Sequence, residues 1–397
     1  MIKRELYLNK INPYINKDII KVITGIRRCG KSTILKQLSA EFIDNGVNKE
    51  NIILINFELK EYFNIENIDQ LDNLVNKLIK NKKDKIYLLF DEIQEVNGWE
   101  KLINSYLAEG RFDIYITGSN AKLLSRELAS YLTGRYVEIK VYPFSYQEFL
   151  EYTNSKHDKN LFNEYIKFGG MPFILKFDDN EKNQYLTDLY NSIILKDVVK
   201  RNEIRDIDLL DRIIQFLMSN IGQSVSANNI SKYLKKDKVK VSVNTIYNYL
   251  SYLEEACFIN KVKREDLIGK KILNFPEKFY LTDLGFRQST YGNNHKDIGQ
   301  SLENLVFIEL LRRDHDIKIG ICKNKEIDFV CRKGDDRIYI QVSYLLASDE
   351  IIKREFDSLN KIQDNYPKYV LSLDDFDFSK NGIKHLNIVD FLTSDEI

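Results

Sequence analysis

Short apolar, β-branched runs alternate with helix-spaced apolar positions along the first third of the chain. Four runs have the length and character of buried strands: residues 19–24, 51–58, 86–90 and 112–117. Residues 69–80 carry leucines and a valine at helical spacing between the second and third runs. The alternation predicts an α/β domain built on a parallel sheet, which we assign to residues 1–142.

The pattern changes after Pro143. Over residues 143–205 the apolar positions recur at helical spacing, which predicts a small helical domain. Residues 206–290 then hold three amphipathic segments followed by two strand-like runs, 258–264 and 278–281, with a polar loop between them. Three helices followed by a β-hairpin predict a winged-helix domain.

The last part of the chain, residues 291–397, begins with an amphipathic helix over residues 299–310. Strand-like runs follow at 326–330 and 337–343, and again near residues 369–373 and 388–389. This order predicts a second α/β domain.

The strongest chemical signal lies between the first strand and the helix that follows it. It reads G-x-x-x-x-G-K-S, the phosphate-binding P-loop or Walker A motif: Gly25-Ile26-Arg27-Arg28-Cys29-Gly30-Lys31-Ser32-Thr33. Glycines let the backbone approach phosphates, and the loop amides and helix N-terminus direct partial positive charge at them. We expect these nine residues to bind ATP, with Lys31 on the β- and γ-phosphates and the Ser32 hydroxyl on Mg²⁺.

A second motif ends the third strand, where Ile86-Tyr87-Leu88-Leu89-Phe90 leads into Asp91 and Glu92. An apolar strand that ends in an acidic pair is the Walker B pattern, and it delivers both carboxylates to the edge where open α/β sheets bind ligands. We expect Asp91 to hold Mg²⁺ through water. Glu92 would orient or deprotonate the attacking water, which makes it the candidate catalytic base.

Polar residues also end the fourth strand. Ser119 or Asn120 is placed to sense the γ-phosphate. A helix N-cap is the equally weighted alternative, and one residue can fill both roles. Arg135 is a candidate arginine finger, with Arg126 as its competitor. An ordinary surface arginine is the alternative for each.

Further motifs join these two: Phe90-Asp91-Glu92-Ile93-Gln94, Thr117-Gly118-Ser119-Asn120-Ala121, Leu132-Thr133-Gly134-Arg135-Tyr136, Pro143-Phe144-Ser145-Tyr146-Gln147-Glu148-Phe149 and Gly169-Gly170-Met171-Pro172. Together they resemble the archaeal and bacterial AAA+ type ATPases that carry a C-terminal DUF4143 domain. The resemblance covers essentially the whole chain. It implies ATP binding and hydrolysis, and a helical lid over residues 143–205.

The third helix of the predicted winged-helix domain, within residues 242–253, carries polar side chains suited to base edges in a major groove: Asn244, Thr245, Asn248 and Ser251. From Ser231 to Lys271 there are ten Lys and Arg against five Asp and Glu. Duplex DNA is therefore one candidate partner. The alternative is that the domain contacts only protein, because a run of charge is usually a solvated face.

The C-terminal order of helix with Glu303, strand with Asp328 and a further strand looks like the PD-(D/E)xK nuclease core. That core needs a second carboxylate and a lysine on the last strand to hold metal and stabilise charge. This chain has Gln341 and Ser343 there. We expect a nuclease-like DUF4143 domain that is inactive.

Composition sets the remaining limits. Lys plus Arg equals Asp plus Glu at 59 each, so the whole molecule has no net attraction for nucleic acid. The four cysteines lack C-x-x-C spacing, which is typical of reduced, buried thiols. The first twenty residues are charged and no apolar run is long enough to span a bilayer, so we expect a cytoplasmic protein without a signal peptide.

These observations predict a Mg²⁺-dependent ATPase whose cycle controls a winged-helix and nuclease-like binding module. Two other functions fit the same sequence. One is an ATP-powered DNA nuclease, and the other is a nucleotide-gated scaffold that binds a protein partner.

Overall fold

The computed structural model describes residues 2–80, 82, 84–119, 134–269, 271–292 and 297–394. The chain divides into two units. The first extends to Pro143 and also includes Glu255–Cys257, and the second takes the rest of the chain from Phe144. Within the described residues, no helix combines the length and the apolar character needed to cross a membrane.

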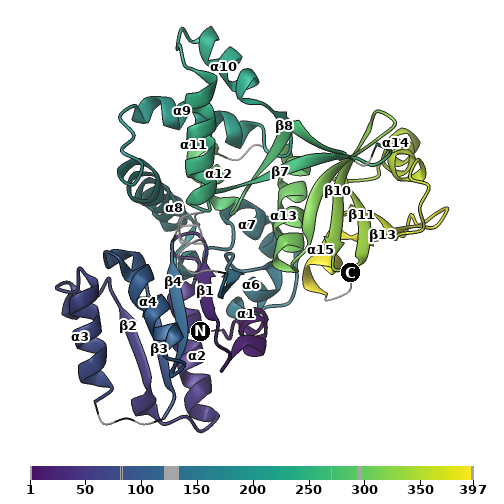
Figure 1. Cartoon of the computed structure of the whole chain (residues 1–397). Coiled ribbons are helices and arrows are strands. Elements are labelled where there is room, and N and C mark those ends of the chain that lie inside the picture. The colour runs from purple at the N-terminus through teal and green to yellow at the C-terminus, as the bar shows by residue number, and fades with distance from the viewer. Residues whose placement is uncertain are drawn as a thin grey trace. The chain divides into compact units, whose positions relative to one another are not determined.

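The first unit is built on a parallel five-stranded sheet with the order β2-β3-β4-β1-β5. Its strands are β1 (Ile20–Thr24), β2 (Ile52–Asn56), β3 (Ile86–Asp91), β4 (Phe112–Gly118) and β5 (Tyr136–Lys140). The predicted parallel α/β sheet is confirmed, and its four predicted strands lie within two residues of their expected ends. This sheet and its helices form the purple and blue part of Figure 1.

Among the described residues of this unit, four α-helices accompany the sheet: α1 (Glu5–Ile11), α2 (Lys31–Asp44), α3 (Ile68–Leu78) and α4 (Trp99–Ala108). The alternating strand residues Ile86, Leu88 and Phe90 share one buried cluster with apolar residues of α3 and α4. The other face meets α2, where the Phe42 ring lies 4.7 Å from that of Tyr87. Both faces are therefore buried, which is why the strands read as continuous apolar runs.

In the second unit the segment predicted to be helical forms α6 (Tyr146–Thr153), α7 (Lys159–Phe168) and α8 (Asp179–Ile193), and α8 continues as a π-helix over Ile194–Lys200. Capping boxes begin two of them, with Ser145 and Glu148 at α6 and Asp178 and Glu181 at α8. Further helices are α9 (Ile207–Ser219), α10 (Ala227–Lys236), α11 (Val243–Glu255), α12 (Gly285–Tyr291), α13 (Ile298–Arg312), α14 (Asp349–Asn360) and α15 (Ile388–Thr393).

The strands of the second unit form an eight-stranded sheet with the order β13-β12-β11-β10-β9-β7-β8-β6. They are β6 (Ser224–Val225), β7 (Ile259–Asp266), β8 (Lys271–Leu281), β9 (Asp316–Cys322), β10 (Lys325–Lys333), β11 (Asp336–Val342), β12 (Lys368–Ser372) and β13 (Ile383–Asn387). The predicted hairpin is present as antiparallel β7 and β8. Because β7 also pairs in parallel with β9, one sheet draws strands from both sides of the boundary predicted at residue 290.

Candidate functional site

The P-loop connects β1 to α2 in the first unit, and its two glycines adopt backbone conformations that other residues rarely take. The φ angle is +147° at Gly25 and +108° at Gly30. A Cβ atom at Gly25 would also lie 2.2 Å from the carbonyl oxygen of Val141. The loop shape therefore depends on glycine at both positions.

Lys31 is the first residue of α2, and its ammonium lies against its own loop. Nζ donates to the carbonyl oxygens of Gly25 at 3.0 Å and Ile26 at 3.2 Å, and it lies 3.7 Å from Oε1 of Glu92. Burial alone would lower the pKa of Lys31, but the Glu92 carboxylate and other nearby groups outweigh burial and raise it. The side chain is therefore positively charged at neutral pH.

Asp91 is the last residue of β3, and each oxygen of its carboxylate accepts a hydrogen bond. The Thr117 hydroxyl donates to Oδ1 at 2.6 Å, and the Asn56 amide donates to Oδ2 at 2.7 Å. The Ser32 side chain is near enough to Asp91 to lower its pKa, so the two predicted metal ligands lie together. Burial raises the pKa of Asp91, while the Thr117 hydroxyl and the nearby Ser32 side chain partly offset that rise.

Glu92 follows in the left-handed region, with φ at 57°. Its backbone N–H donates to the Thr117 hydroxyl oxygen at 3.0 Å, and the Gln94 amide donates to its Oε2 at 2.5 Å. Burial favours the neutral carboxyl, but the Lys31 charge and hydrogen bonds from Gln94 and Ser119 outweigh it and lower the pKa of Glu92. The carboxylate is therefore ionised beside the P-loop lysine.

The other residues of the P-loop differ in how far their side chains are exposed. Ile26 and Cys29 are fully buried, and burial raises the pKa of the Cys29 thiol. Arg27 forms an ion pair with Glu58 at 2.6 Å. Arg28 is exposed, with a positive φ of 68°.

Comparison with known proteins identifies relatives along the whole chain. An uncharacterized protein of Haemophilus influenzae is 39% identical over 397 residues, which is 99% of this chain and 98% of that protein. Uncharacterized protein MJ1544 of Methanocaldococcus jannaschii is 35% identical over 370 residues, 87% of this chain and 81% of that protein. The chain belongs to the family of these two proteins.

Two family models match this member of the family. Residues 17–150 match the AAA domain, and residues 159–297 match a domain of unknown function, DUF8612. The domain of unknown function that matches is therefore not the DUF4143 named from the sequence, and it covers residues before the C-terminal segment 298–397. A solved structure with a similar fold is the Walker-type ATPase PABY2304 of Pyrococcus abyssi, with 16% identity, a TM-score of 0.49 and coverage of 73% of this chain and 95% of that one.

Two predicted residues of the AAA domain, Asn120 and the competing Arg126, lie outside the described residues. Arg135 is described and exposed, directly before β5. The parallel register pairs Tyr136 with Ile20 at the start of β1, whereas the P-loop follows Thr24 at its end. Arg135 is therefore roughly 17 Å from its own P-loop, the length of a five-residue strand.

Sequence reasoning missed three residues that hold the acidic pair in place: Asn56, Thr117 and Gln94. Asn56 ends β2 and Thr117 precedes the last residue of β4, so their places at the carboxyl ends of parallel strands were the available signal. A fourth residue, Arg4, contacts the loop from outside every motif, and no sequence pattern marked it.

In the second unit, Glu303 of α13 and Asp328 of β10 are brought together around a lysine from β8. Lys278 Nζ lies 3.0 Å from Glu303, 2.8 Å from Glu326 and 3.8 Å from Asp328. Gln341, at the position where a nuclease carries a carboxylate, accepts from the Asp328 N–H at 3.3 Å. Among the residues that the structure describes, no group of three or more His, Cys, Asp or Glu is placed to hold a metal ion.

Helix α11 presents Asn244, Asn248 and Ser251 to solvent, while Thr245 is half-buried. The segment before it carries exposed lysines: Lys232, Lys235, Lys236, Lys238 and Lys240. The amide side chains and the lysines therefore form one polar and basic stretch.

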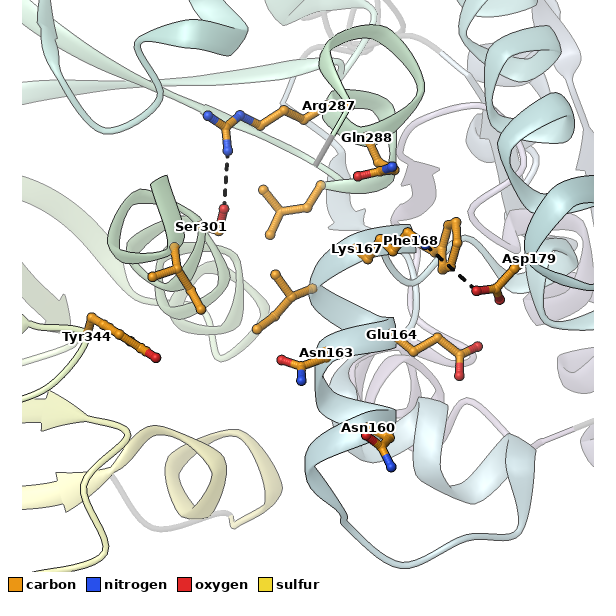
Figure 2. A pocket seen from close by; sticks show the side chains of 14 residues that line it. Asn160, Asn163, Glu164, Lys167, Phe168, Asp179, Arg287, Gln288, Ser301 and Tyr344 are labelled. Carbon is orange, nitrogen blue, oxygen red and sulfur yellow. Dashed lines mark hydrogen bonds and ion pairs between the residues drawn. The ribbon is translucent and has the colours of Figure 1, made fainter. Parts of the chain in front are cut away.

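A cavity of about 590 Å³ in the second unit is lined by residues of α7, α12 and α13 (Figure 2). The cationic side chains of its lining, Lys167 and Arg287, each have polar or acidic partners close by. Lys167 lies 3.7 Å from Asp179, and Arg287 donates to Ser301 at 3.4 Å and to Asp297 at 2.6 Å. The lining thus has no predominant charge that would select a ligand.

Proposed function

We propose that this protein is a Mg²⁺-dependent ATPase. The observation that carries the proposal is the convergence of Lys31, Ser32, Asp91 and Glu92 at the carboxyl edge of one parallel sheet. A glycine loop with its lysine, a carboxylate to hold Mg²⁺ and a carboxylate to orient water are the parts that phosphoryl transfer to water needs, and here they belong to an AAA domain.

The loop residues fit a triphosphate. Gly25 and Gly30 give the backbone room, and the amides of residues 25–33 together with the start of α2 supply the positive ends of dipoles. The Lys31 ammonium would exchange its loop carbonyls for the β- and γ-phosphates. Ile26, Arg27, Arg28, Cys29 and Thr33 complete the cradle.

Ser32 and Asp91 fit Mg²⁺ because both offer oxygen and the Ser32 side chain is near enough to Asp91 to lower its pKa. Bound Mg²⁺ supplies charge neutralisation on the phosphates. In its absence Thr117 and Asn56 keep the Asp91 carboxylate oriented.

Glu92 is the residue we assign to the attacking water. Its lowered pKa keeps it ionised, and the hydrogen bond from Gln94 fixes one carboxylate oxygen. The carboxylate would orient the water and accept its proton. We further propose Asn120 as the γ-phosphate sensor and Arg135 as a finger acting on a neighbouring subunit, since Arg135 is remote from its own loop.

The second unit is proposed to be the module that the ATP cycle controls, with a winged-helix part over 206–290 and a nuclease-like part over 291–397. The exposed amides of α11 and the lysines before it support duplex DNA as the partner. Gln341 and Ser343, with Lys278 among the carboxylates, support a nuclease-like domain without cleavage activity.

The test is the steady-state rate of ATP hydrolysis by the full chain, with and without duplex DNA. We expect Mg²⁺-dependent hydrolysis that DNA stimulates, and no cleavage of plasmid DNA in Mg²⁺ or Mn²⁺. Hydrolysis without stimulation, together with a co-purifying protein, would favour the scaffold function. Cleavage that Asp328→Ala abolishes would overturn the inactive assignment.

A further inference from the structure

A buried arginine outside the recognised motifs lies against the P-loop. Arg4 precedes α1 and is 1% exposed. Its Nη1 donates to the carbonyl oxygen of Cys29 at 3.0 Å, and its Nη2 donates to that of Tyr142 at 2.9 Å. A Cβ atom at Gly30 would lie 3.1 Å from Nη1, so the guanidinium packs directly under the Cys29–Gly30 peptide.

The segment that carries Arg4 is fixed on two sides. The Arg4 N–H donates to Oε1 of Gln37 on α2 at 3.0 Å, and Gln37 Nε2 donates back to the Ile2 carbonyl at 2.7 Å. On the other side, the Tyr142 N–H donates to the Tyr7 hydroxyl oxygen at 3.0 Å. The guanidinium therefore has a defined position relative both to α2 and to the segment that follows β5.

This position determines which way one loop amide points. In a planar trans peptide the C=O and N–H groups point in opposite directions. With the Cys29 oxygen held by Arg4, the Gly30 N–H must face away from Arg4. Gly30, at φ +108°, has no side chain to hinder that orientation.

We propose that Arg4 is a positioning residue for nucleotide binding, which orients the Cys29–Gly30 peptide so that the Gly30 N–H donates to a phosphate of ATP. The inference rests on the proposed ATP binding at this loop. The amide contacts the phosphate before and during the reaction, so its loss weakens binding in both states. Such a loss raises KM and leaves kcat nearly unchanged.

The test compares Arg4→Met with Lys3→Met in the full chain. Methionine keeps an unbranched apolar side chain of similar reach but has no donors, and exposed Lys3 gives the same loss of charge one residue earlier. Calorimetry with Mg²⁺ and a non-hydrolysable ATP analogue gives Kd, and steady-state hydrolysis gives KM and kcat. We expect Kd and KM to rise about tenfold or more in Arg4→Met, since a hydrogen bond with a charged partner is lost. Lys3→Met should match the wild type.

The outcomes separate this inference from the proposed function. Wild-type protein that binds no analogue overturns both. Wild-type binding with an unchanged Kd in folded Arg4→Met overturns only the role of Arg4. If Arg4→Met does not fold, Arg4→Lys decides, because a single ammonium lacks the fork that spans two carbonyls. A raised Kd and KM with unchanged kcat in Arg4→Lys supports the inference, and wild-type values contradict it.

Discussion

The ammonium of Lys31 lies 3.7 Å from the carboxylate of Glu92, and both side chains are buried. The residue that we assign to phosphate binding is thus ion-paired with the residue that we assign to orienting the attacking water. Each charge favours ionisation of the other against the effect of burial. Nucleotide binding must therefore compete with Glu92 for Lys31.

Substitution of Glu92 should separate binding from hydrolysis. In Glu92→Gln the carboxylate that competes for Lys31 is lost, so we expect ATP to bind at least as tightly as in the wild type. Hydrolysis should fall about 100-fold or more, because the amide cannot accept a proton from water. Calorimetry and phosphate release measure the two effects. The exposed Glu95→Gln is the matched control, and equal loss of both properties in Glu92→Gln would argue against the assignment.

Thr117 offers a test through pH. Its hydroxyl stabilises ionised Asp91, whose pKa burial already raises. Thr117→Val removes that donor, so the pKa of Asp91 should rise further and the acid limb of the pH–rate profile should move to higher pH. The Mg²⁺ concentration that activity requires should rise as well, because a protonated Asp91 cannot act as a carboxylate ligand of the cation.

Two measurements check this expectation: profiles of kcat/KM against pH and titrations of activity with Mg²⁺. Thr187→Val, which removes a hydroxyl bonded within α8, is the control and should leave both unchanged. An acid limb in Thr117→Val that coincides with that of the wild type would contradict the role given to Asp91.

Lys278 should be essential for stability in the second unit. Lys278→Met leaves the carboxylates of Glu303, Glu326 and Asp328 without their shared cation, and we expect a loss of about 3–5 kcal/mol in the free energy of unfolding at pH 7. Burial and the charge of Glu303 already raise the pKa of Asp328. At pH 5 more of the Asp328 carboxyl is neutral in the folded variant, so the loss should be smaller. Urea unfolding at both pH values measures the loss in the free energy of unfolding, and Lys261→Met on β7 is the control. A loss that is the same at both pH values would contradict this explanation.

The two glycines that end α7 and α12 give a matched pair. Gly169 and Gly292 share a positive φ, +74° and +73°, with ψ near 180°, a conformation almost restricted to glycine, so alanine costs about 1–3 kcal/mol of strain at each. At Gly169 the added Cβ would also lie 1.8 Å from Oδ1 of Asp283, which accepts the Gly285 N–H, whereas at Gly292 no atom of the described residues lies within 4 Å. Gly169→Ala should therefore lower the free energy of unfolding by several kcal/mol more than Gly292→Ala, and equal losses would contradict the packing described here.

The parallel sheet was predictable because its strands are buried on both faces and its two motifs follow strands β1 and β3. Asp91 and Glu92 were found because acidic residues that end an apolar run are conspicuous. Thr117 was quoted only as part of a motif, since a threonine within a strand is ordinary. Arg4 was not predictable, because its contact with Cys29 spans 25 positions and no local pattern encodes it.

The second unit shows a different limit. The order of its helices and strands follows local periodicity, and most predicted elements are present. The strand predicted at residues 388–389 is wrong, because these residues begin helix α15, where the Asn387 side chain caps the helix by accepting from the Val389 N–H. The pairing of β7 with β9 joins residues 55 positions apart, such as Arg264 and Ile319, which periodicity does not reveal. Lys278 was likewise overlooked as the cation of the carboxylate cluster, because it comes from a neighbouring strand rather than from the nuclease-like motif.

The central claim is that residues of the P-loop make this protein a Mg²⁺-dependent ATPase. The most direct measurement is phosphate release from ATP by the wild type, Lys31→Ala and the exposed Lys36→Ala on the same helix, each with Mg²⁺ and with EDTA. The account predicts hydrolysis by the wild type and Lys36→Ala in Mg²⁺ alone, and its loss in Lys31→Ala. Equal rates for Lys31→Ala and the wild type, or a rate that EDTA does not reduce, would contradict it.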